Sequence, residues 1–585
     1  MSSPVATIEV PRALRLPARG SLFWLAVAPL AALAVATLAM HVFGISGGDD
    51  PAHLYKIALL RDGQSVIWDN YWYGGSYGTL TYGIVYYWLA QFVPGVLLTV
   101  VTGGLLPLLF HLYLRDGWGV RGRAPAWTLA AVMVVYLAWG QAPFLLAMCF
   151  TMGGLALLAR GRPLLGALPC ALGVFTNPLA LVAGGIFLLA ALVARPAARR
   201  GIVVFALAMI PVCAVRIALA AVFAAPSWEY HYMAELGGLT VVALIGIALA
   251  RRCSAPERRA LQWVFVALLV VVVPAYLLPD SPMGSNAGRF FYVFGGPLVV
   301  AVAWPSRLPR LVPVAAAAAV LAFQLAFPVW MLANAQSFTA TRAAFFATAV
   351  DYAGRVYDPD YRFHVVTPEM HWESYYFPAA GFPITRGWYR QADALHNQEL
   401  YDRSLDTGAY SSWLRRMGVR YVFVPHAPLV ADARREAAIL AGSREFTVVY
   451  RGADWTVYRL GRSQPLVVPL ASASASVLTM DHTSIRFAVT RPGPYLVKLT
   501  WSPYWLVARR PDDPAQRGRD GRRDRSWEDD ALPSGRALPS GRALPSGRAL
   551  LHKDPYGFMV FTAPAAGVYA LRFDLARPAE AELRQ

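Results

Sequence analysis

Long apolar runs alternate with short polar loops over the first 333 residues of the chain. The runs lie near residues 21–43, 94–114, 126–141, 143–159, 163–176, 178–194, 202–224, 237–250, 260–278, 290–304 and 311–333. About 20 apolar residues in a helix cross a bilayer core, and several of these runs are shorter. The short pair around Asn177 fits either two short helices or one re-entrant hairpin. The pattern predicts a polytopic α-helical membrane protein with about 11 transmembrane helices.

Basic residues mark one side of these runs. Seventeen arginines lie in the N-terminal segment and in alternate loops: Arg12, Arg15, Arg19, Arg115, Arg121, Arg123, Arg160, Arg162, Arg195, Arg199, Arg200, Arg251, Arg252, Arg258, Arg259, Arg307 and Arg310. The opposite loops before Ala333 hold only Lys56, Arg61 and Arg289. Cytoplasmic loops carry the excess of Lys and Arg. We therefore expect a cytoplasmic N-terminus (residues 1–20), a membrane domain (21–333) and an extracytoplasmic C-terminal region.

The composition agrees with a membrane protein. Of the 585 residues, 57% are apolar and 15% are charged, whereas soluble proteins carry about 25% charged residues. This excludes an ordinary soluble enzyme and a disordered chain. The net charge of +18 follows from the one-sided arginines, so it does not indicate nucleic-acid binding. Scarce lysine with abundant Arg, Ala and Gly suggests a GC-rich bacterial genome, and hence a bacterial plasma membrane.

The pattern changes after Ala333. Residues 334–463 predict an α/β domain, with a helix that ends at Gly418, a buried strand after it, and a hairpin around Gly452. Residues 464–585 alternate apolar and polar positions and predict a β-sandwich. An insert at 509–549 is rich in Arg, Asp, Pro and Gly and repeats Ala-Leu-Pro-Ser-Gly-Arg three times. It has too few apolar residues to fold, so we expect a disordered loop.

The first outer loop, residues 44–80, carries the strongest candidate chemistry. Asp49 and Asp50 follow the first run directly, Pro51 suits the first turn of a helix, and His53 lies one turn further. A carboxylate beside a second carboxylate has a raised pKa, which suits a general base. The alternative is that Asp49 or Asp50 only caps the helix.

Aromatic residues and paired glycines follow in the same loop. Trp68, Asp69, Tyr71, Trp72 and Tyr73 precede Gly74-Gly75. Sugar rings stack on aromatic faces, so we take these five residues as candidate substrate contacts. Trp and Tyr near a membrane span are also common as interface residues. That reading applies best to Tyr82, Tyr86 and Tyr87.

Together these motifs resemble the GT-C glycosyltransferase superfamily. They are most similar to bacterial membrane proteins labelled 6-pyruvoyl-tetrahydropterin synthase-related, whose pattern has an Asp, a His four residues later, and a Gly/Trp/Gly-Gly run before a Tyr-rich span. Asp49 and His53 match that spacing. Gly387-Trp-Tyr-Arg-Gln391 and Gly418-Val-Arg-Tyr-Val422 resemble the C-terminal region of the same group. The label implies no pterin chemistry here, because the sequence lacks a His-rich zinc cluster.

The resemblance implies an inverting transferase that takes a sugar from a polyprenyl-phosphate donor and modifies an envelope glycan, lipid or protein. By that analogy Asp49 is the expected base, with Asp50 as the second choice, and His53 orients the acid or contacts phosphate. A divalent cation (Mg²⁺, Mn²⁺ or Ca²⁺) held by Asp49 and Asp50 is compatible with the pair, but two carboxylates do not establish it. The pair is Asp-Asp rather than the Asp-Glu of protein O-mannosyltransferases, so that acceptor does not follow.

Several further residues are candidates for substrate binding. Arg289, at the outer end of the tenth run, suits a bidentate contact with lipid phosphate, or reaches the interface as a snorkelling side chain. Glu229 and His231 lie in an outer loop and suit an acceptor contact or a plain polar turn. His371–Tyr376 and Arg386–Arg390 mix aromatic and charged residues, as sugar sites and packed domain surfaces both do.

Two other functional classes fit the same architecture. The first is a non-catalytic membrane scaffold or a glycan-binding factor of envelope assembly. The second is a transporter, which is disfavoured because the acidic residues cluster at the outer surface and the runs show no internal repeat.

Overall fold

The computed structural model describes residues 18–78, 82–223, 233–278, 284–510, 531–532 and 550–575. Contacts divide the chain into two compact units. The first, here called the membrane unit, comprises Met1–Gly47, Trp88–Ile217 and Trp228–Ala333. The second, called the outer unit after its predicted side of the membrane, comprises Gly48–Tyr87, Ala218–Ser227 and Asn334–Gln585. Each unit is described separately below.

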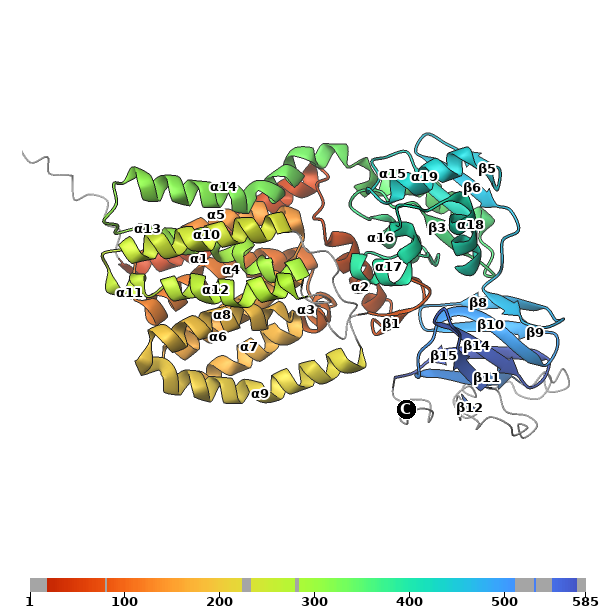
Figure 1. Ribbon diagram of the computed structural model, residues 1–585, viewed down its shortest axis with the longest axis horizontal. Coiled ribbons are helices and arrows are strands. Elements are labelled where there is room, and N and C mark those ends of the chain that lie inside the picture. Colours follow the sequence, from red (N-terminus) through yellow and green to blue (C-terminus); the bar gives the residue numbers. More distant parts are fainter. Residues whose placement is uncertain are drawn as a thin grey trace, which may run out of the picture. The chain divides into compact units, whose positions relative to one another are not determined.

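The membrane unit is a bundle of apolar helices (Figure 1). They are α1 (Ala18–Val42), α4 (Gly95–Trp118), α5 (Ala124–Tyr136), α6 (Ala142–Ala159), α7 (Pro163–Thr176), α8 (Leu179–Ala194), α9 (Arg199–Val222), α10 (Met233–Arg252), α11 (Pro256–Arg259), α12 (Gln262–Leu277), α13 (Arg289–Ala303) and α14 (Leu311–Asn334). The short helix α3 (Ile84–Ala90) precedes α4 in the chain, and its residues divide between the two units after Tyr87.

These helices correspond to the predicted apolar runs. Within the described residues, eight are long and apolar enough to cross a membrane, and three shorter apolar helices, Ala124–Trp139, Pro163–Thr176 and Leu179–Ala194, match the three remaining predicted segments. The pair around Asn177 consists of two separate helices, α7 and α8, and the Asn177 side chain accepts a hydrogen bond from the Leu179 amide at 3.0 Å. The prediction of a polytopic helical membrane protein is confirmed.

The outer unit contains an α/β domain after α14. Its sheet has the strand order β3 (Arg362–Val365), β4 (Val419–Pro425), β6 (Trp455–Leu460), β5 (Phe446–Arg451), with β3 and β4 parallel. Its helices are α15 (Ala343–Val356), α16 (Glu373–Ala379), α17 (Arg390–His396), α18 (Thr407–Arg416) and α19 (Ala433–Gly442). Neighbouring strand residues point to opposite faces, so Phe423 enters one apolar core and Val422 the other.

The predicted helix, glycine and strand around Gly418 are confirmed. Asp406 caps α18 by accepting a hydrogen bond from the Ala409 amide at 2.8 Å. Gly418 ends the helical region in the left-handed conformation, with φ of 73°. A residue without a Cβ adopts this conformation at little cost. The chain then enters β4 directly, which carries buried Val419, Val422 and Phe423 between the two cores.

The C-terminal residues form the predicted β-sandwich. One sheet has the order β13 (Leu550–Lys553), β14 (Phe558–Ala563), β10 (Gly493–Thr500), β7 (Val467–Pro469), and the other β12 (Ala531–Leu532), β11 (Trp505–Arg510), β15 (Gly567–Phe573), β9 (Ser484–Val489), β8 (Ala475–Met480). Inward-facing residues of both sheets form one apolar core. Apart from its first two residues and β12, the insert 509–549 lies outside the described residues.

The first outer loop belongs to the outer unit by its contacts. The sequence analysis assigns residues 44–80 to the membrane domain, whereas Gly48–Tyr87 groups with the C-terminal region. The helix α2 (Asp50–Arg61) contacts α16, and Tyr55, Leu59 and Trp72 join the core of the α/β domain. A hairpin of β1 (Trp68–Asp69) and β2 (Ser76–Tyr77) places Trp68 in the core of the sandwich. The loop is held because its aromatic side chains complete both cores.

Candidate active site

Asp49 and Asp50 lie at the start of α2. Pro51 occupies the first turn, as predicted, and Asp49 is the N-cap residue, but its side chain makes no capping hydrogen bond. Simple capping therefore does not account for the Asp49 carboxylate. Asp49 is buried, whereas Asp50 is half-buried. The two acids have different surroundings, which is the usual basis for different roles of paired carboxylates.

The charges of Asp49 and Asp50 raise the pKa values of two different tyrosines. The pKa of Tyr389 is raised to about 12, because burial and the charge of Asp49 raise it by more than the hydrogen bond with Tyr87 lowers it. Burial and then the charge of Asp50 raise the pKa of Tyr86. The charge of Asp49 thus acts on Tyr389, and that of Asp50 on Tyr86. Both tyrosines are neutral at pH 7 and available as hydrogen-bond donors.

His53 connects the helix α2 to this group of tyrosines. It is buried one turn after Asp49, and its Nδ1 lies 2.9 Å from the Tyr87 hydroxyl oxygen. Tyr87 in turn forms a side-chain hydrogen bond with Tyr389. These hydrogen bonds link His53 through Tyr87 to Tyr389. The structure therefore brings Asp49, Asp50 and His53 together with Tyr87 and Tyr389. The sequence analysis took Tyr87 for an interface residue and named Tyr389 only as part of the segment Arg386–Arg390.

The Asp69 carboxylate is held by hydrogen bonds with other residues of the chain. It accepts hydrogen bonds from the Tyr55 hydroxyl at 2.8 Å and the Tyr71 amide at 3.0 Å, and His482 Nδ1 lies 3.0 Å away. Burial alone would raise the pKa of Asp69, but the hydrogen bond of His482 and the nearby Lys56 ammonium outweigh it and lower that pKa. Asp69 therefore joins α2 to the sandwich as a buried anion.

The four predicted aromatic contacts are also buried. Trp68 stacks on Phe573 with ring centroids 4.7 Å apart, and Tyr71 lies 4.1 Å from His482 by the same measure. Trp72 donates to the Ser374 carbonyl at 3.0 Å, and Tyr73 donates to the Tyr389 carbonyl at 2.9 Å. Because protein groups cover their faces, we leave these residues out of the substrate contacts proposed below.

The remaining predicted site residues lie elsewhere. Glu229 and His231 fall outside the described residues. Arg289 is the first residue of α13 in the membrane unit, close to Glu235, which hydrogen bonds with Tyr276 and Tyr292. The sequence analysis missed this acid–tyrosine group. The sequence feature that could have indicated this group is Glu235, an acidic residue at the predicted outer end of an apolar run.

The sequence analysis allows a divalent cation at Asp49 and Asp50. Among the described residues, no group of three His, Cys, Asp or Glu side chains could hold a metal ion. Mg²⁺ and Ca²⁺ take six or more oxygen ligands, and Asp49 and Asp50 supply two carboxylates that neighbour different tyrosines. A divalent cation at this pair stays a prediction, and no step below is routed through one.

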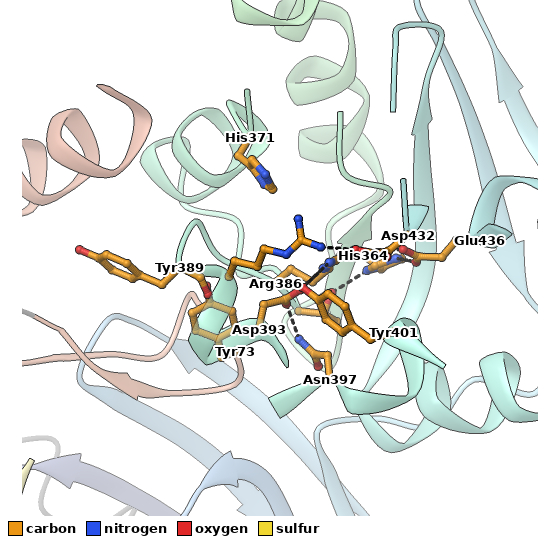
Figure 2. A network of polar contacts seen from close by, with 12 residues as sticks. Tyr73, His364, His371, Arg386, Tyr389, Asp393, Asn397, Tyr401, Asp432 and Glu436 are labelled. Atoms are coloured by element: carbon orange, nitrogen blue, oxygen red, sulfur yellow. Dashed lines mark hydrogen bonds and ion pairs between the residues drawn. The ribbon is translucent and has the colours of Figure 1, made fainter. Parts of the chain in front are cut away.

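A second polar network occupies the α/β domain (Figure 2). The Arg386 guanidinium pairs with Asp393 and, at 3.0 Å, with Glu436. Glu436 also lies 2.6 Å from His364 Nε2, and Asn397 and Tyr401 both donate to Asp393. The sequence analysis singled out Arg386 from its aromatic neighbours, but it missed Glu436 and His364, whose positions carry no local signal.

The solved structures that are similar to this chain include AftD, AglB and ArnT. The arabinofuranosyltransferase AftD from mycobacteria aligns with 78% of this chain at 18% identity and a TM-score of 0.42. The Archaeoglobus fulgidus oligosaccharyltransferase AglB, in complex with an inhibitory peptide and a dolichol-phosphate, aligns with 69% of this chain and 70% of its own at 13% identity and a TM-score of 0.39. ArnT from Cupriavidus metallidurans, bound to undecaprenyl phosphate, aligns with 76% of this chain and 98% of its own at 14% identity and a TM-score of 0.34.

No protein-family model and no curated protein matches the sequence. The chain spans 41% of the length of AftD. At these identities a likeness concerns the fold alone, so what the chain does is argued below from its own residues.

Gly387 holds the segment Arg386–Arg390 against the first outer loop. A Cβ at this position would lie 2.7 Å from Tyr73 Cζ and 2.8 Å from the Trp72 ring. Both rings are buried and cannot shift freely. Gly387→Ala should therefore lower the free energy of unfolding by about 1–3 kcal/mol, measured by urea unfolding with tryptophan fluorescence. Gly354→Ala is the matched control: its Cβ would meet Phe382 at an ordinary 3.7 Å inside α15, and a gain or no change is expected. Equal losses of unfolding free energy in Gly387→Ala and Gly354→Ala would contradict the close packing of Gly387 against Tyr73 and Trp72.

Glu373 should make stability depend on pH above neutrality. Burial raises the pKa of this carboxyl from 4.5 to about 8, so the folded protein keeps a proton that the unfolded chain has lost. Its stabilising effect is complete below pH 4.5 and disappears as the pH rises to 8. Burial also lowers the pKa of His371 from 6.5 to about 4, which has the opposite effect below pH 6.5. Burial lowers the pKa of Lys498 to about 7, which opposes the loss above pH 7. The contribution of Glu373 should therefore show as the difference between wild type and Glu373→Gln from pH 6.5 to 8, with a slope of at most about 1.4 kcal/mol per pH unit.

Glu373→Gln should flatten this slope in urea unfolding measured from pH 6.5 to 8. Glu399→Gln is the control, because its carboxylate is exposed beside Arg416, and it should keep the wild-type slope. A Glu373→Gln slope equal to that of the wild type would contradict the assignment.

Proposed function

We propose that the chain is an inverting, GT-C-type membrane glycosyltransferase that uses a polyprenyl-phosphate-linked sugar on the extracytoplasmic face of a bacterial plasma membrane. The acceptor is an envelope glycan, lipid or protein. The observation that carries the proposal is the buried Asp49 carboxylate, which makes no capping bond, is next to Asp50 and one turn before His53, and acts by its charge on Tyr389. The donor class comes from the sequence resemblance, and it is also the class of lipid present with AglB and ArnT.

The proposed reaction is one displacement. The acceptor hydroxyl gives its proton to the Asp49 carboxylate, and its oxygen attacks the anomeric carbon of the donor sugar. The bond between that carbon and the phosphate oxygen breaks on the opposite face, and polyprenyl phosphate leaves with the electron pair. The anomeric configuration is therefore inverted. A general base of this kind contributes about 10²–10⁴-fold to the rate.

The neighbouring residues set up Asp49 for this step. Tyr389 stays neutral because its pKa is raised to about 12, so it can donate a hydrogen bond to the carboxylate without protonating it. His53 and Tyr87 orient Tyr389 through consecutive hydrogen bonds. Asp50, with its separate neighbour Tyr86, contributes negative charge that favours proton uptake by Asp49.

Turnover of lipid-linked sugars tests the proposal. Full-length protein in nanodiscs receives a panel of radiolabelled polyprenyl-phosphate sugars and a crude envelope extract, beside the Asp49→Asn/Asp50→Asn double variant. Label should move to an acceptor with the wild type only. Transfer by both proteins would contradict the site. Donor binding without any transfer would favour the alternative of a glycan-binding scaffold.

A further inference from the structure

The backbone carbonyl of Tyr389 accepts hydrogen bonds from two directions. Tyr389 directly precedes α17, and its carbonyl oxygen accepts the Asp393 amide of the first helical turn at 2.9 Å. The same oxygen accepts a second hydrogen bond, also at 2.9 Å, from the hydroxyl of Tyr73, which lies 316 residues earlier in the chain. Both tyrosines belong to the outer unit. The Tyr73 hydroxyl is therefore a direct contact between the first outer loop and the backbone of Tyr389.

The backbone of Tyr73 has an unfavourable conformation. Tyr73 has a φ of 57°, and Gly74 and Gly75 follow with φ of 72° and 111°. A tyrosine is uncommon in the left-handed region, and backbone strain of this kind gathers at functional sites. A glycine would adopt the same conformation without strain. The turn thus carries a residue that its backbone disfavours, and what this residue adds is its side chain.

The ring and the hydroxyl of Tyr73 make different contacts. The ring is buried, stacks on the His396 ring with centroids 5.6 Å apart, and packs against Gly387. A phenylalanine would make the same ring contacts. The hydroxyl donates to the Tyr389 carbonyl, and it remains a donor at neutral pH because burial raises the pKa of Tyr73 well above its ordinary value. Packing therefore explains the ring of Tyr73, whereas the hydroxyl acts on Tyr389.

A hydrogen bond at the carbonyl restrains the direction of the Tyr389 side chain. It limits rotation about the Cα–C bond, the torsion ψ, which is 106° in Tyr389. The Tyr389 ring leaves from the same Cα and points away from the Arg386 network (Figure 2). On that side it forms a side-chain hydrogen bond with Tyr87. Without the Tyr73 hydroxyl the carbonyl still has the Asp393 amide, so the change affects orientation and leaves no buried acceptor unsatisfied.

We propose that Tyr73 is a positioning residue for the transfer reaction, because its hydroxyl fixes the Tyr389 backbone and so keeps the Tyr389 ring bonded to Tyr87 and under the charge of Asp49. The role in transfer rests on the proposed glycosyltransferase function, whereas the restraint of Tyr389 rests on the hydrogen bond between the two tyrosines. The first outer loop then supplies both the base, at the start of α2, and the group that orients the tyrosine on which the base acts.

Single-turnover rates in nanodiscs at saturating donor test the role in transfer. Tyr73→Phe should slow transfer about tenfold, since a small misplacement of a catalytic group has an effect of this order or larger. The affinity for the donor should not change. Tyr389→Phe should slow transfer at least as much, and the double variant should be no slower than Tyr389→Phe, because Tyr73 acts only through Tyr389.

Tyr495→Phe is the matched control for loss of a buried tyrosine hydroxyl. Tyr495 is as buried as Tyr73, and its hydroxyl also donates to a backbone carbonyl, that of Arg491, at 2.6 Å in the sandwich. This variant should keep the wild-type rate. Urea unfolding should show a similar small loss of stability in Tyr495→Phe and Tyr73→Phe, so a difference in rate between them reports on positioning.

Fluorine NMR of a fluorotyrosine in place of Tyr389 measures the ring without donor or acceptor. Tyr73→Phe should shift and broaden its signal, and Tyr495→Phe should leave it unchanged. A signal unchanged by Tyr73→Phe would overturn the restraint of Tyr389. A wild-type rate in Tyr73→Phe, losses that multiply in the double variant, or an equal loss in Tyr495→Phe would overturn the positioning role. A shifted signal in a protein that transfers no sugar would support the restraint and remove the proposed function.

Discussion

Asp49→Asn should reduce sugar transfer at least about 10³-fold, and Asp50→Asn about tenfold. Asparagine has nearly the same shape as aspartate but cannot take the acceptor proton. Asp49 is the buried acid beside Tyr389, and Asp50 is the half-buried acid beside Tyr86. The loss should therefore be larger at Asp49. Single-turnover rates at saturating donor measure the chemical step directly.

The helix α2 provides a matched control for this prediction. Asp62 follows the same helix at its C-terminal end, is exposed, and should tolerate Asn without change in rate. All three variants should insert and resist protease as the wild type does, since none removes an apolar side chain from a core. A larger loss at Asp50 than at Asp49 would exchange the two roles. Wild-type rates in both variants would reject the acidic pair as the site.

The sequence predicts the fold well wherever one period of hydrophobicity decides the structure. Eight helices of the membrane unit follow from apolar length alone. In the sandwich, β9 alternates buried and half-buried positions along its whole length, as a strand with one face in a core must. The helix, left-handed Gly418 and β4 also follow from local rules, since each depends on residues close in sequence.

The candidate site was harder to predict because burial depends on distant partners. Trp68 resembles a residue of an exposed sugar platform, but Phe573 and Trp505 cover its ring from more than 400 residues along the chain. The sequence placed Asp49 and His53 one helical turn apart, and that spacing holds. Tyr389, the residue that neighbours Asp49, comes from a segment 340 residues later. No local pattern could have joined the two.

The ion-pair network of Arg386 also includes a partner, Glu436, that is distant in sequence and could not be predicted. Loss of Arg386 should have a large effect on stability. Arg386→Met should lower the free energy of unfolding by about 3–5 kcal/mol, because it leaves the buried Asp393 and Glu436 carboxylates without their shared cation. The Arg386 side chain is only 5% exposed, and those of Asp393 and Glu436 are 4% and 0% exposed. Urea unfolding of the full-length protein, followed by tryptophan fluorescence, measures the change.

The size of that effect depends on burial and not on the number of ion pairs. Arg415 also pairs with a carboxylate, Glu445, at 2.7 Å, but these side chains are 25% and 41% exposed. Water screens such a pair, so Arg415→Met should cost at most about 1 kcal/mol. Neutralising the acids as well, in Arg386→Met/Asp393→Asn/Glu436→Gln, should recover much of the loss, because most of it comes from unpaired buried charge rather than from the missing attraction. If the triple variant were less stable than Arg386→Met, the acids would stabilise the domain through their other partners, His364, Asn397 and Tyr401.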